Sequence, residues 1–319
     1  MRLYRLLALA LPLALIACND RIQPEQQAAP SAPPVKKVRV ALVMKTLTNP
    51  FFIEMEKGAR KAAAELNLDL IVKTAAEETS FEQQVAIVDD LVQKKLIDAL
   101  VVAPADAYHL IPSVIKARDA GIAVVNIDAR LDPKQLKDAG SAVVPFISVD
   151  NEQGGFLSAK TLIAGVTKPT QAAIIEGIRT AENAQARKNG AVRAFASNRA
   201  VKLVASESAN WKIDEAYTVT KSIFAKHPNI GLIFAANDMM ALGVLKYLAD
   251  SGHGKVKVAG FDALAEARTA ISQGTLVASI DQQAAEQGYQ GVLYAMRAFK
   301  REQLPAQTLL NVKLVTIEK

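Results

Sequence analysis

The chain has 319 residues, half of them hydrophobic, which is long enough for two ordinary domains with a substantial buried core. Its formal charge is +6, and its lysines and arginines are scattered along the chain without forming a basic block. These features argue against nucleic acid as a partner and favour a folded protein with a surface of mixed charge.

The first eighteen residues have the pattern of a secretion signal. Arg2 and Arg5 precede an apolar run over residues 6–16, which is shorter than the roughly 20 residues that a bilayer span needs. Cys18 follows this run and is the only cysteine, so it has no partner for an internal disulfide. The segment resembles the lipobox of bacterial lipoproteins, which implies a signal peptide over residues 1–18 and lipidation of Cys18. The alternative is a small apolar residue beside an ordinary cleavage site.

Residues 19–36 form the next segment, which is polar and rich in proline, alanine and glutamine. It has no helical or strand periodicity and too few large apolar side chains to form a core, so we predict a disordered tether. The folded body then begins at residue 37. With a lipid on Cys18, this body is expected to be held at a membrane surface outside the cytoplasm, in the periplasm or at the cell surface.

From residue 37 onward, strand-like apolar runs alternate with helical patterns. In the first half we predict strands over residues 38–44, 68–72, 100–103 and 122–127, and helices over 50–66, 81–94 and 110–117. In the second half we predict helices over residues 154–163, 184–196, 215–226, 238–250 and 284–300. The strands predicted there cover residues 172–175, 201–204, 230–234, 256–261, 276–280 and 309–315.

These strands are continuously apolar, which is typical of parallel sheets that are covered on both faces. Regular alternation of strand and helix indicates right-handed crossovers. The pattern therefore predicts an α/β fold with two doubly wound, Rossmann-like domains of parallel sheet.

Polar and aromatic residues follow many of the predicted strands. In open α/β sheets, ligands bind outside the carboxyl ends of the strands, so these positions are candidates for a binding site. They are Lys45, Thr46, Asn49, Pro104, Asp106, Asp128, Arg130, Glu176, Trp211, Asn237, Asp238, Asp262, Asp281 and Gln282.

Signatures of catalysis and of common cofactors are missing from the sequence. It contains no dinucleotide fingerprint after a strand, no Walker A sequence, no nucleophile elbow and no H-E-x-x-H motif. The three histidines lie far apart and the single cysteine stands alone, which gives no basis for a transition-metal site. We therefore expect no cofactor, no metal and no enzymatic activity.

Eight segments resemble, in order and spacing, those of the type I periplasmic sugar-binding proteins. They read MKTLTNPFF, NIDARLD, IIEG, ARKNG, ANW, FAANDMMALG, GFDA and SIDQQ. The likeness covers residues 38–319 and is strongest to the ribose/allose cluster, in which Lys45 and Trp211 match the allose-binding type.

This resemblance implies two lobes that are joined by a three-strand hinge and enclose a ligand. The implied N-terminal lobe comprises residues 37–147 plus 283–311, and the C-terminal lobe comprises 148–282 plus 312–319. The hinge strands are expected near residues 147–151, 280–284 and 311–314.

The resemblance also implies roles for individual residues. The aromatic rings would pack against the apolar face of a sugar, while the polar groups bind its hydroxyls. The implied ligand contacts are Lys45, Asn49, Phe51, Phe52, Asp128, Arg130, Asn189, Trp211, Asn237, Asp262 and Gln282.

Structural roles remain open for several of these positions. Asn237 and Asp262 each precede a helical run and could be N-caps. One of the two phenylalanines is expected to belong mainly to the core. Arg187 could be a structural, ion-pairing arginine, with Asn189 as the ligand contact. Arg130 could reach the ligand from another angle or face solvent.

The implied function is that of a monomeric, lipid-anchored solute-binding protein that captures a monosaccharide or polyol by hinge closure and delivers it to an ABC transporter permease. An alternative is a sensor that presents a sugar, polyol or autoinducer to a chemoreceptor or sensor kinase. A sugar-responsive repressor would need a DNA-binding segment where residues 1–36 show a signal and a tether. Ribose binders have Asp-Arg where this chain has Asp128 and Ala129, so a pentose, a hexose, a polyol and a cyclitol all remain candidates.

Overall fold

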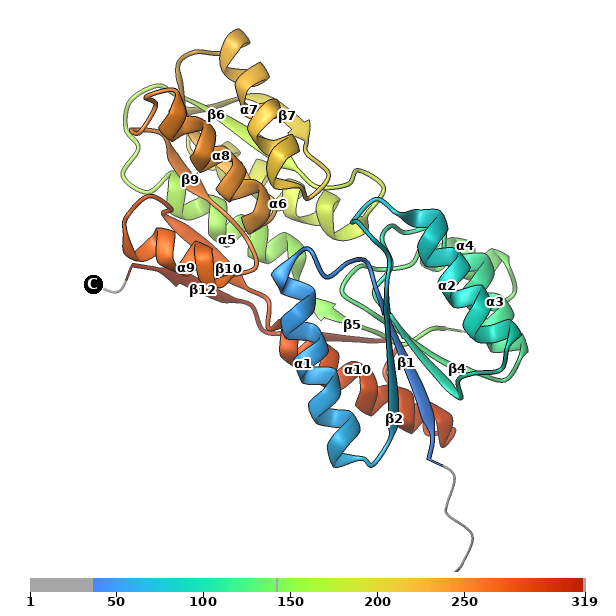
Figure 1. The fold of residues 1–319 in the computed structure, drawn as a ribbon. Helices are drawn as coiled ribbons and strands as arrows, with labels where there is room; N and C mark the ends of the chain where they lie inside the picture. The colour runs from blue at the N-terminus through green and yellow to red at the C-terminus, as the bar shows by residue number, and fades with distance from the viewer. Residues whose placement is uncertain (1–36, 142, 318–319) are drawn as a thin grey trace, which may run out of the picture. The chain divides into compact units, whose positions relative to one another are not determined.

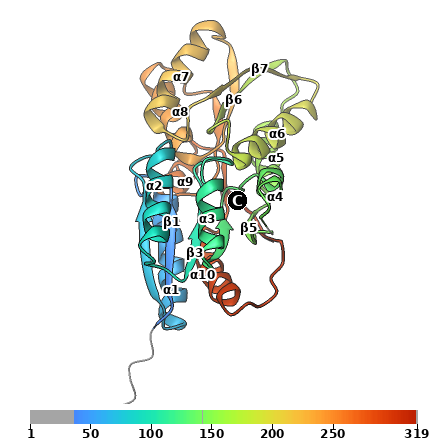
Figure 2. The same ribbon diagram turned by 90° about the vertical axis from the view of Figure 1, so that its right-hand side faces the viewer.

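The computed structural model describes residues 37–141 and 143–317. The predicted signal peptide, the lipidation of Cys18 and the tether lie outside the described residues. The described part contains two six-stranded sheets, each covered by helices (Figures 1 and 2). Within it, no helix combines the length and the apolar character needed to cross a membrane.

The first sheet has the strand order β11-β5-β4-β3-β1-β2, and all its neighbouring strands are parallel. We call this sheet and its helices the N-terminal lobe. Its strands are β1 (Arg39–Met44), β2 (Asp69–Thr74), β3 (Ala99–Val102), β4 (Ala123–Ile127), β5 (Phe146–Val149) and β11 (Gln307–Leu310). Its helices are α1 (Pro50–Glu65), α2 (Phe81–Gln93), α3 (Ile111–Asp119), α4 (Pro133–Asp138) and α10 (Ala284–Phe299).

Both faces of the first sheet are buried, as the continuous apolar strands predict. In β1, Leu42 packs in one core cluster with residues of α1 and α10, while Val43 packs in a second cluster with residues of α2 and α3. Successive side chains of a strand point to opposite faces, so α1 and α10 cover one face and α2 and α3 cover the other (Figure 1).

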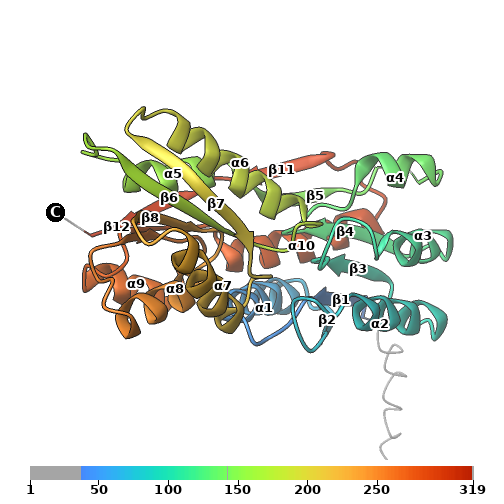
Figure 3. The same ribbon diagram turned by 90° about the horizontal axis from the view of Figure 1, so that it is seen from above.

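The second sheet has the order β12-β10-β9-β8-β6-β7 and is parallel except for the antiparallel pair β10–β12. We call this sheet and its helices the C-terminal lobe. Helices α5 and α6 pack together on one side of the sheet, and α7, α8 and α9 lie on the other (Figure 3). The strands are β6 (Thr170–Glu176), β7 (Val201–Ser208), β8 (Ile230–Ala235), β9 (Lys257–Ala259), β10 (Ala278–Asp281) and β12 (Lys313–Thr316). The helices are α5 (Asn151–Leu162), α6 (Glu182–Ala196), α7 (Ile213–Lys226), α8 (Asp238–Asp250) and α9 (Ala265–Ser272).

The chain passes between the two sheets at three places, which are β5 to α5, β10 to α10 and β11 to β12. The predicted lobe boundary after residue 147 falls inside β5, and the crossing follows two residues later, after Val149. The prediction of one strand over residues 309–315 is wrong, because β11 and β12 belong to different sheets. An apolar run does not indicate which sheet its residues join, so the strand pattern alone did not show this break. It falls at the lobe boundary between residues 311 and 312 that the resemblance implied.

Two further elements were not predicted. Helices α4 and α9 have six and eight residues, and so few residues give little periodic signal. Each follows a strand end, at β4 and β9, and therefore lies close to the loops in which the candidate residues are found.

Candidate functional site

The loops at the carboxyl ends of the strands surround a small cavity between the two lobes. The N-terminal lobe contributes Lys45, Asn49, Phe51, Phe52, Glu78 and Asp128 to its lining. The remaining lining residues are Asn183, Arg187, Trp211, Asp262 and Gln282. The cavity measures about 20 Å³, which is room for about one water molecule.

Lys45 and Asp128 form a buried ion pair in the wall of this cavity. Lys45 follows β1, Asp128 follows β4, and the Lys45 Nζ lies 2.8 Å from Asp128 Oδ2, with both side chains 3% exposed. The ammonium group also lies 5.5 Å from the centroid of the Phe52 ring. Asp128 adopts a left-handed backbone with φ of 64°, a conformation that costs a non-glycine residue about 1–3 kcal/mol and that gathers at functional sites.

Asn49 sets the start of α1 and thereby the position of two aromatic rings. Its Oδ1 accepts a hydrogen bond from the Phe51 backbone N–H at 3.0 Å, and Pro50 follows as the first helical residue. The Phe51 and Phe52 rings are 5.1 Å apart in an edge-to-face arrangement. Both are almost fully buried in the core of the lobe and both also line the cavity, so the two roles are compatible at each position.

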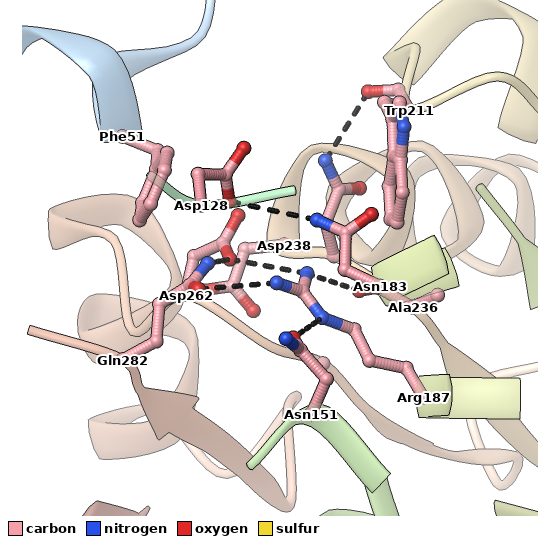
Figure 4. A network of polar contacts seen from close by, with 12 residues as sticks. Phe51, Asp128, Asn151, Asn183, Arg187, Trp211, Ala236, Asp238, Asp262 and Gln282 are labelled. Atoms are coloured by element: carbon pink, nitrogen blue, oxygen red, sulfur yellow. Dashed lines mark hydrogen bonds and ion pairs between the residues drawn. The ribbon is translucent and has the colours of Figure 1, made fainter. Parts of the chain in front are cut away.

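Arg187 organises the polar groups of the C-terminal lobe (Figure 4). Its guanidinium donates to Asn151 Oδ1 at 2.8 Å, to the Ala236 carbonyl at 2.9 Å and to Gln282 Oε1 at 3.1 Å. It also lies 3.5 Å from Asp262 Oδ1, and Gln282 Nε2 donates to that same oxygen at 2.6 Å. Arg187, Asp262 and Gln282 therefore form one rigid, buried group of donors and acceptors.

Burial perturbs the acids around this group. It raises the pKa of Asp262 well above its ordinary value, although the nearby Arg187 charge acts in the opposite direction. Burial also raises the pKa of Asp238, behind the cavity, to about 7. On the other lobe, burial raises the pKa of Glu78 against the attraction of Lys45. The cavity is thus surrounded by carboxyl groups that lack the solvation of bulk water.

Trp211 closes the opposite side of the polar group from Phe51 (Figure 4). Its backbone is left-handed, with φ of 68°, and its indole packs against Gly177, where any Cβ would overlap the ring. The Trp211 carbonyl accepts a hydrogen bond from Asn237 Nδ2 at 3.3 Å. Asn237 also caps α8 by accepting from the Met240 N–H at 2.9 Å, so it supports Trp211 and is not part of the cavity lining.

Like Asn237, two other predicted contacts lie outside the cavity lining. Asn189 is exposed on α6, because it falls on the helix face opposite to Asn183 and Arg187, which are four residues apart and share a face. Arg130 turns toward the edge of the first sheet, where it donates to Gln307 Oε1 at 3.2 Å and lies 5.4 Å from the Phe146 ring. The structure therefore places neither residue in the cavity lining, and their contact with a ligand stays a prediction.

Three lining residues were missed or given a lesser role. Glu78 lies in the loop after β2, and the rule of strand ends would have found it if that loop had been included. Asn183 is the second residue of α6, in a segment without a recognisable sequence pattern. To predict that its side chain faces the cavity, one must know where the helix begins and which face it presents. For Arg187 a structural role was left open, and the structure shows that it both holds its neighbours and lines the cavity.

Some buried polar atoms of the lining have no hydrogen-bond partner among residues 37–141 and 143–317. Apart from Asp128 Oδ2, which is ion-paired with Lys45, they are Glu78 Oε2, Asn183 Oδ1 and Trp211 Nε1. A buried polar atom without a partner costs about 1–3 kcal/mol, and here three such atoms from both lobes surround one cavity. The same part of the chain has no cluster of histidine, cysteine, aspartate and glutamate that could hold a metal ion. Aromatic rings on two sides with donors and acceptors between them suit a small ring that has apolar faces and a polar rim.

Comparison with known proteins agrees with this arrangement of two α/β lobes around a small polar cavity. A family model described as a periplasmic binding protein domain matches residues 40–303. A D-ribose/D-allose-binding protein of Pseudomonas aeruginosa is 38% identical over 265 residues, which are 82% of each chain. The D-allose-binding periplasmic protein of Escherichia coli K12 is 34% identical over 278 residues, covering 86% of this chain and 89% of that one.

A solved structure extends the likeness to three dimensions. An ABC transporter periplasmic solute-binding protein from Actinobacillus succinogenes with bound D-allose has a TM-score of 0.82 at 39% identity, covering 88% of this chain and 98% of that one. The chain therefore belongs to the type I periplasmic binding protein family, in its ribose/allose cluster. Members of this family are binding proteins, and this chain is a binding protein and not an enzyme.

Proposed function

We propose that the protein captures a monosaccharide of the allose or ribose kind between its lobes and delivers it to an ABC transporter permease. The observation that carries this proposal is the set of three unpartnered buried polar atoms from both lobes, placed between aromatic rings at one cavity. Hydroxyl groups of a sugar can both donate and accept, so one ligand can satisfy all three atoms. The names of the similar proteins, which mention ribose, allose and ABC transport, support the same ligand class and partner.

Capture requires the lobes to separate. A cavity of about 20 Å³ is far smaller than ligand pockets, which hold roughly 300–1,000 Å³. We infer that the lobes, with the boundaries given above, move as two bodies about the three crossing segments. Because a sugar would contact both lobes only when they approach each other, ligand would favour the closed form, and the closed form would dock on the permease.

Few bonds between the lobes would have to break for this opening. Asn183 Nδ2 donates to Asp128 Oδ1 at 3.5 Å, and the Ala107 N–H donates to the Thr180 carbonyl at 3.2 Å. An ion pair between Lys212 and Glu77, with 2.7 Å between Nζ and Oε2, also joins the two lobes. In the ligand complex, the Asp128 carboxylate would exchange its bond with Asn183 for sugar hydroxyls.

Within the cleft, each kind of side chain has a chemical task. Phe51 and Trp211 would enclose the apolar faces of the sugar ring, and Phe52 would support Phe51. Asp128 and Asp262 would accept hydrogen bonds from hydroxyls, while the buried Lys45 and Arg187 donate. Charge-assisted hydrogen bonds of this kind contribute about 1.5–3 kcal/mol each, and a wrong epimer would leave some of these buried groups unpaired.

A thermal-shift screen of the purified protein against pentoses, hexoses, polyols and cyclitols tests this proposal. A ligand at 100 times its Kd adds about 2.7 kcal/mol to the free energy of unfolding. We expect D-allose or D-ribose to raise the Tm by a few degrees. Absence of any shift with every sugar would contradict the ligand class.

We also propose that the protein is exported and anchored by a lipid on Cys18. This rests on the order of basic, apolar and small residues before the sole cysteine. Metabolic labelling with a clickable fatty acid in a bacterial host should label the wild-type chain and not Cys18→Ser. Equal labelling of both, or of neither, would contradict the anchor.

A further inference from the structure

Glu78 lies in a loop that is fixed from several sides. This loop joins β2 to α2, and its Ala76 backbone donates to Gln83 Oε1 at 2.8 Å and accepts from Thr46 Oγ1 at 3.0 Å. The Glu77 N–H donates to Ser80 Oγ at 3.2 Å. The loop therefore holds Glu78 in one place, with 5% of the residue exposed.

The two carboxyl oxygens of Glu78 have unequal surroundings. Oε1 accepts a hydrogen bond from Asn49 Nδ2 at 3.0 Å, whereas Oε2 is buried without a hydrogen-bond partner in the described part of the chain. Glu78 lines the cavity, so a ligand is the group best placed to supply the missing partner. Burying a carboxylate costs free energy unless its charge is paired and both of its oxygens accept hydrogen bonds. In Glu78 only Oε1 accepts a hydrogen bond from the protein.

The lining residues of the N-terminal lobe are bonded among themselves in two pairs. Lys45 pairs with Asp128, and Asn49 pairs with Glu78. The Lys45 ammonium group is thus held by Asp128 at 2.8 Å. The second oxygen of Glu78 is therefore available to a hydroxyl of the ligand, on the wall of the cavity that this lobe forms.

We propose that Glu78 is a specificity-determining residue whose Oε2 accepts a hydrogen bond from one hydroxyl of the bound monosaccharide. This inference rests on the proposed function and deepens it. A sugar that lacks this hydroxyl, or carries it in the opposite configuration, leaves Oε2 buried without a partner. Sites built to bind a hydroxyl discriminate strongly against analogues without it for this reason. Glu78 thereby selects among sugars that share the same ring.

The test is a set of calorimetric titrations of wild-type protein and Glu78→Gln. The ligands are the best-bound sugar of the screen and each of its monodeoxy analogues. We expect Glu78→Gln to bind the parent sugar at least about tenfold more weakly, because a charge-assisted hydrogen bond is lost. For one monodeoxy analogue, the two proteins should have equal affinity, because that analogue already lacks the hydroxyl that Glu78 binds.

Glu82→Gln is the matched control, since Glu82 is an exposed glutamate in the first turn of α2. It should bind every ligand as the wild type does. If the thermal transition shows that Glu78→Gln does not fold, Glu78→Asp replaces it. The shorter aspartate keeps the negative charge but moves the carboxylate away from the ligand. The same monodeoxy analogue should then be the one that binds wild type and variant with equal affinity.

Two results would overturn the inference while leaving the proposed function intact. One is equal affinity of wild type and variant for all ligands. The other is a uniform loss across the whole series, which would indicate a general structural role. Failure of the wild-type protein to bind any sugar would overturn the proposed function itself, and the inference with it.

Discussion

Asp128, Trp211 and Asp262 reach the cavity from backbones with positive φ, at 64°, 68° and 118°. Such conformations cost non-glycine residues about 1–3 kcal/mol each and persist where the surrounding structure enforces them. All three follow strand ends, where the chain must turn sharply while a large or charged side chain still faces the cleft. Strain at these residues is what we expect of a site in which the direction of a side chain matters more than local stability.

We predict that Gly177→Ala weakens sugar binding, although the new methyl group would not contact the ligand itself. Its methyl group would overlap the Trp211 indole and displace it from the cleft. We expect a loss of several-fold to about tenfold, the scale of one lost aromatic contact. Trp211 is the only tryptophan, so its fluorescence reports both the displacement and the titration. If Gly177→Ala had the same tryptophan emission and the same sugar affinity as the wild type, the proposed contact of Trp211 with the sugar would be wrong.

The raised pKa of Asp238 predicts how stability depends on pH. A carboxyl group with a higher pKa in the folded protein keeps its proton up to a higher pH there than in the unfolded chain. The free energy of unfolding therefore falls as pH rises from the pKa of the unfolded state to that of the folded state. For Asp238 this window runs from 3.8 to about 7. Glu78 and Asp262 have raised pKa values as well and act in the same direction. The pKa of Glu176 is lowered, so this residue makes the free energy of unfolding rise with pH, but only below its ordinary pKa of 4.5.

Urea unfolding without ligand should therefore give a smaller free energy of unfolding at pH 7 than at pH 5. One group contributes at most about 1.4 kcal/mol per pH unit. Asp238→Asn, which resembles the protonated acid, should reduce this dependence. A free energy of unfolding that rises between pH 5 and pH 7 would contradict the assignment.

At the scale of elements, the strands and long helices were predictable because their periodicity reflects burial. Continuous apolar runs indicated sheets covered on both faces, and the predicted helix over residues 238–250 coincides with α8 (Asp238–Asp250). The strand-end rule also predicted Lys45, Asp128 and Asp262 as lining residues. The resemblance implied Asn189 as a contact, but the phase of α6 leaves this side chain exposed and outside the cavity lining. The apolar run over residues 309–315 did not indicate that β11 and β12 belong to different sheets.

Helix pairs that approach closely depend on glycine, and α1 with α10 is one such pair. A Cβ on Gly58 would overlap the Ala285 carbonyl oxygen, and that oxygen belongs to helix backbone that cannot move aside cheaply. We expect Gly58→Ala to lower the free energy of unfolding by about 1–3 kcal/mol, although alanine is the better helix former.

Gly254→Ala is the matched control for both glycine variants. A Cβ there would meet no atom within 4 Å, and the backbone is not left-handed. Urea unfolding should show near-wild-type stability for Gly254→Ala and a clear loss for Gly58→Ala. Equal stability of the two would show that α1 and α10 tolerate a wider separation than the structure has.

At the scale of the whole folded body, the ion pair of Lys212 with Glu77 joins the rims of the two lobes. Lys212→Ala should hasten sugar release, because the closed form loses a contact that the open form does not make. Exposed ion pairs contribute about 0.2–1 kcal/mol, so we expect an increase of at most about fivefold, measured by stopped-flow tryptophan fluorescence. Lys246→Ala removes an ion pair with Asp250 inside α8 and serves as the control. Equal release rates in the two variants would show that the rim pair does not hold the lobes together.

The central claim is that one monosaccharide binds between the lobes, and calorimetric titration of D-allose and of D-ribose into the purified protein tests it most directly. The account predicts saturable binding of one sugar per chain. It also predicts an affinity at least about tenfold weaker in Asp262→Asn, which loses a charged acceptor of the site. No heat of binding with either sugar, or wild-type affinity in Asp262→Asn, would contradict the account.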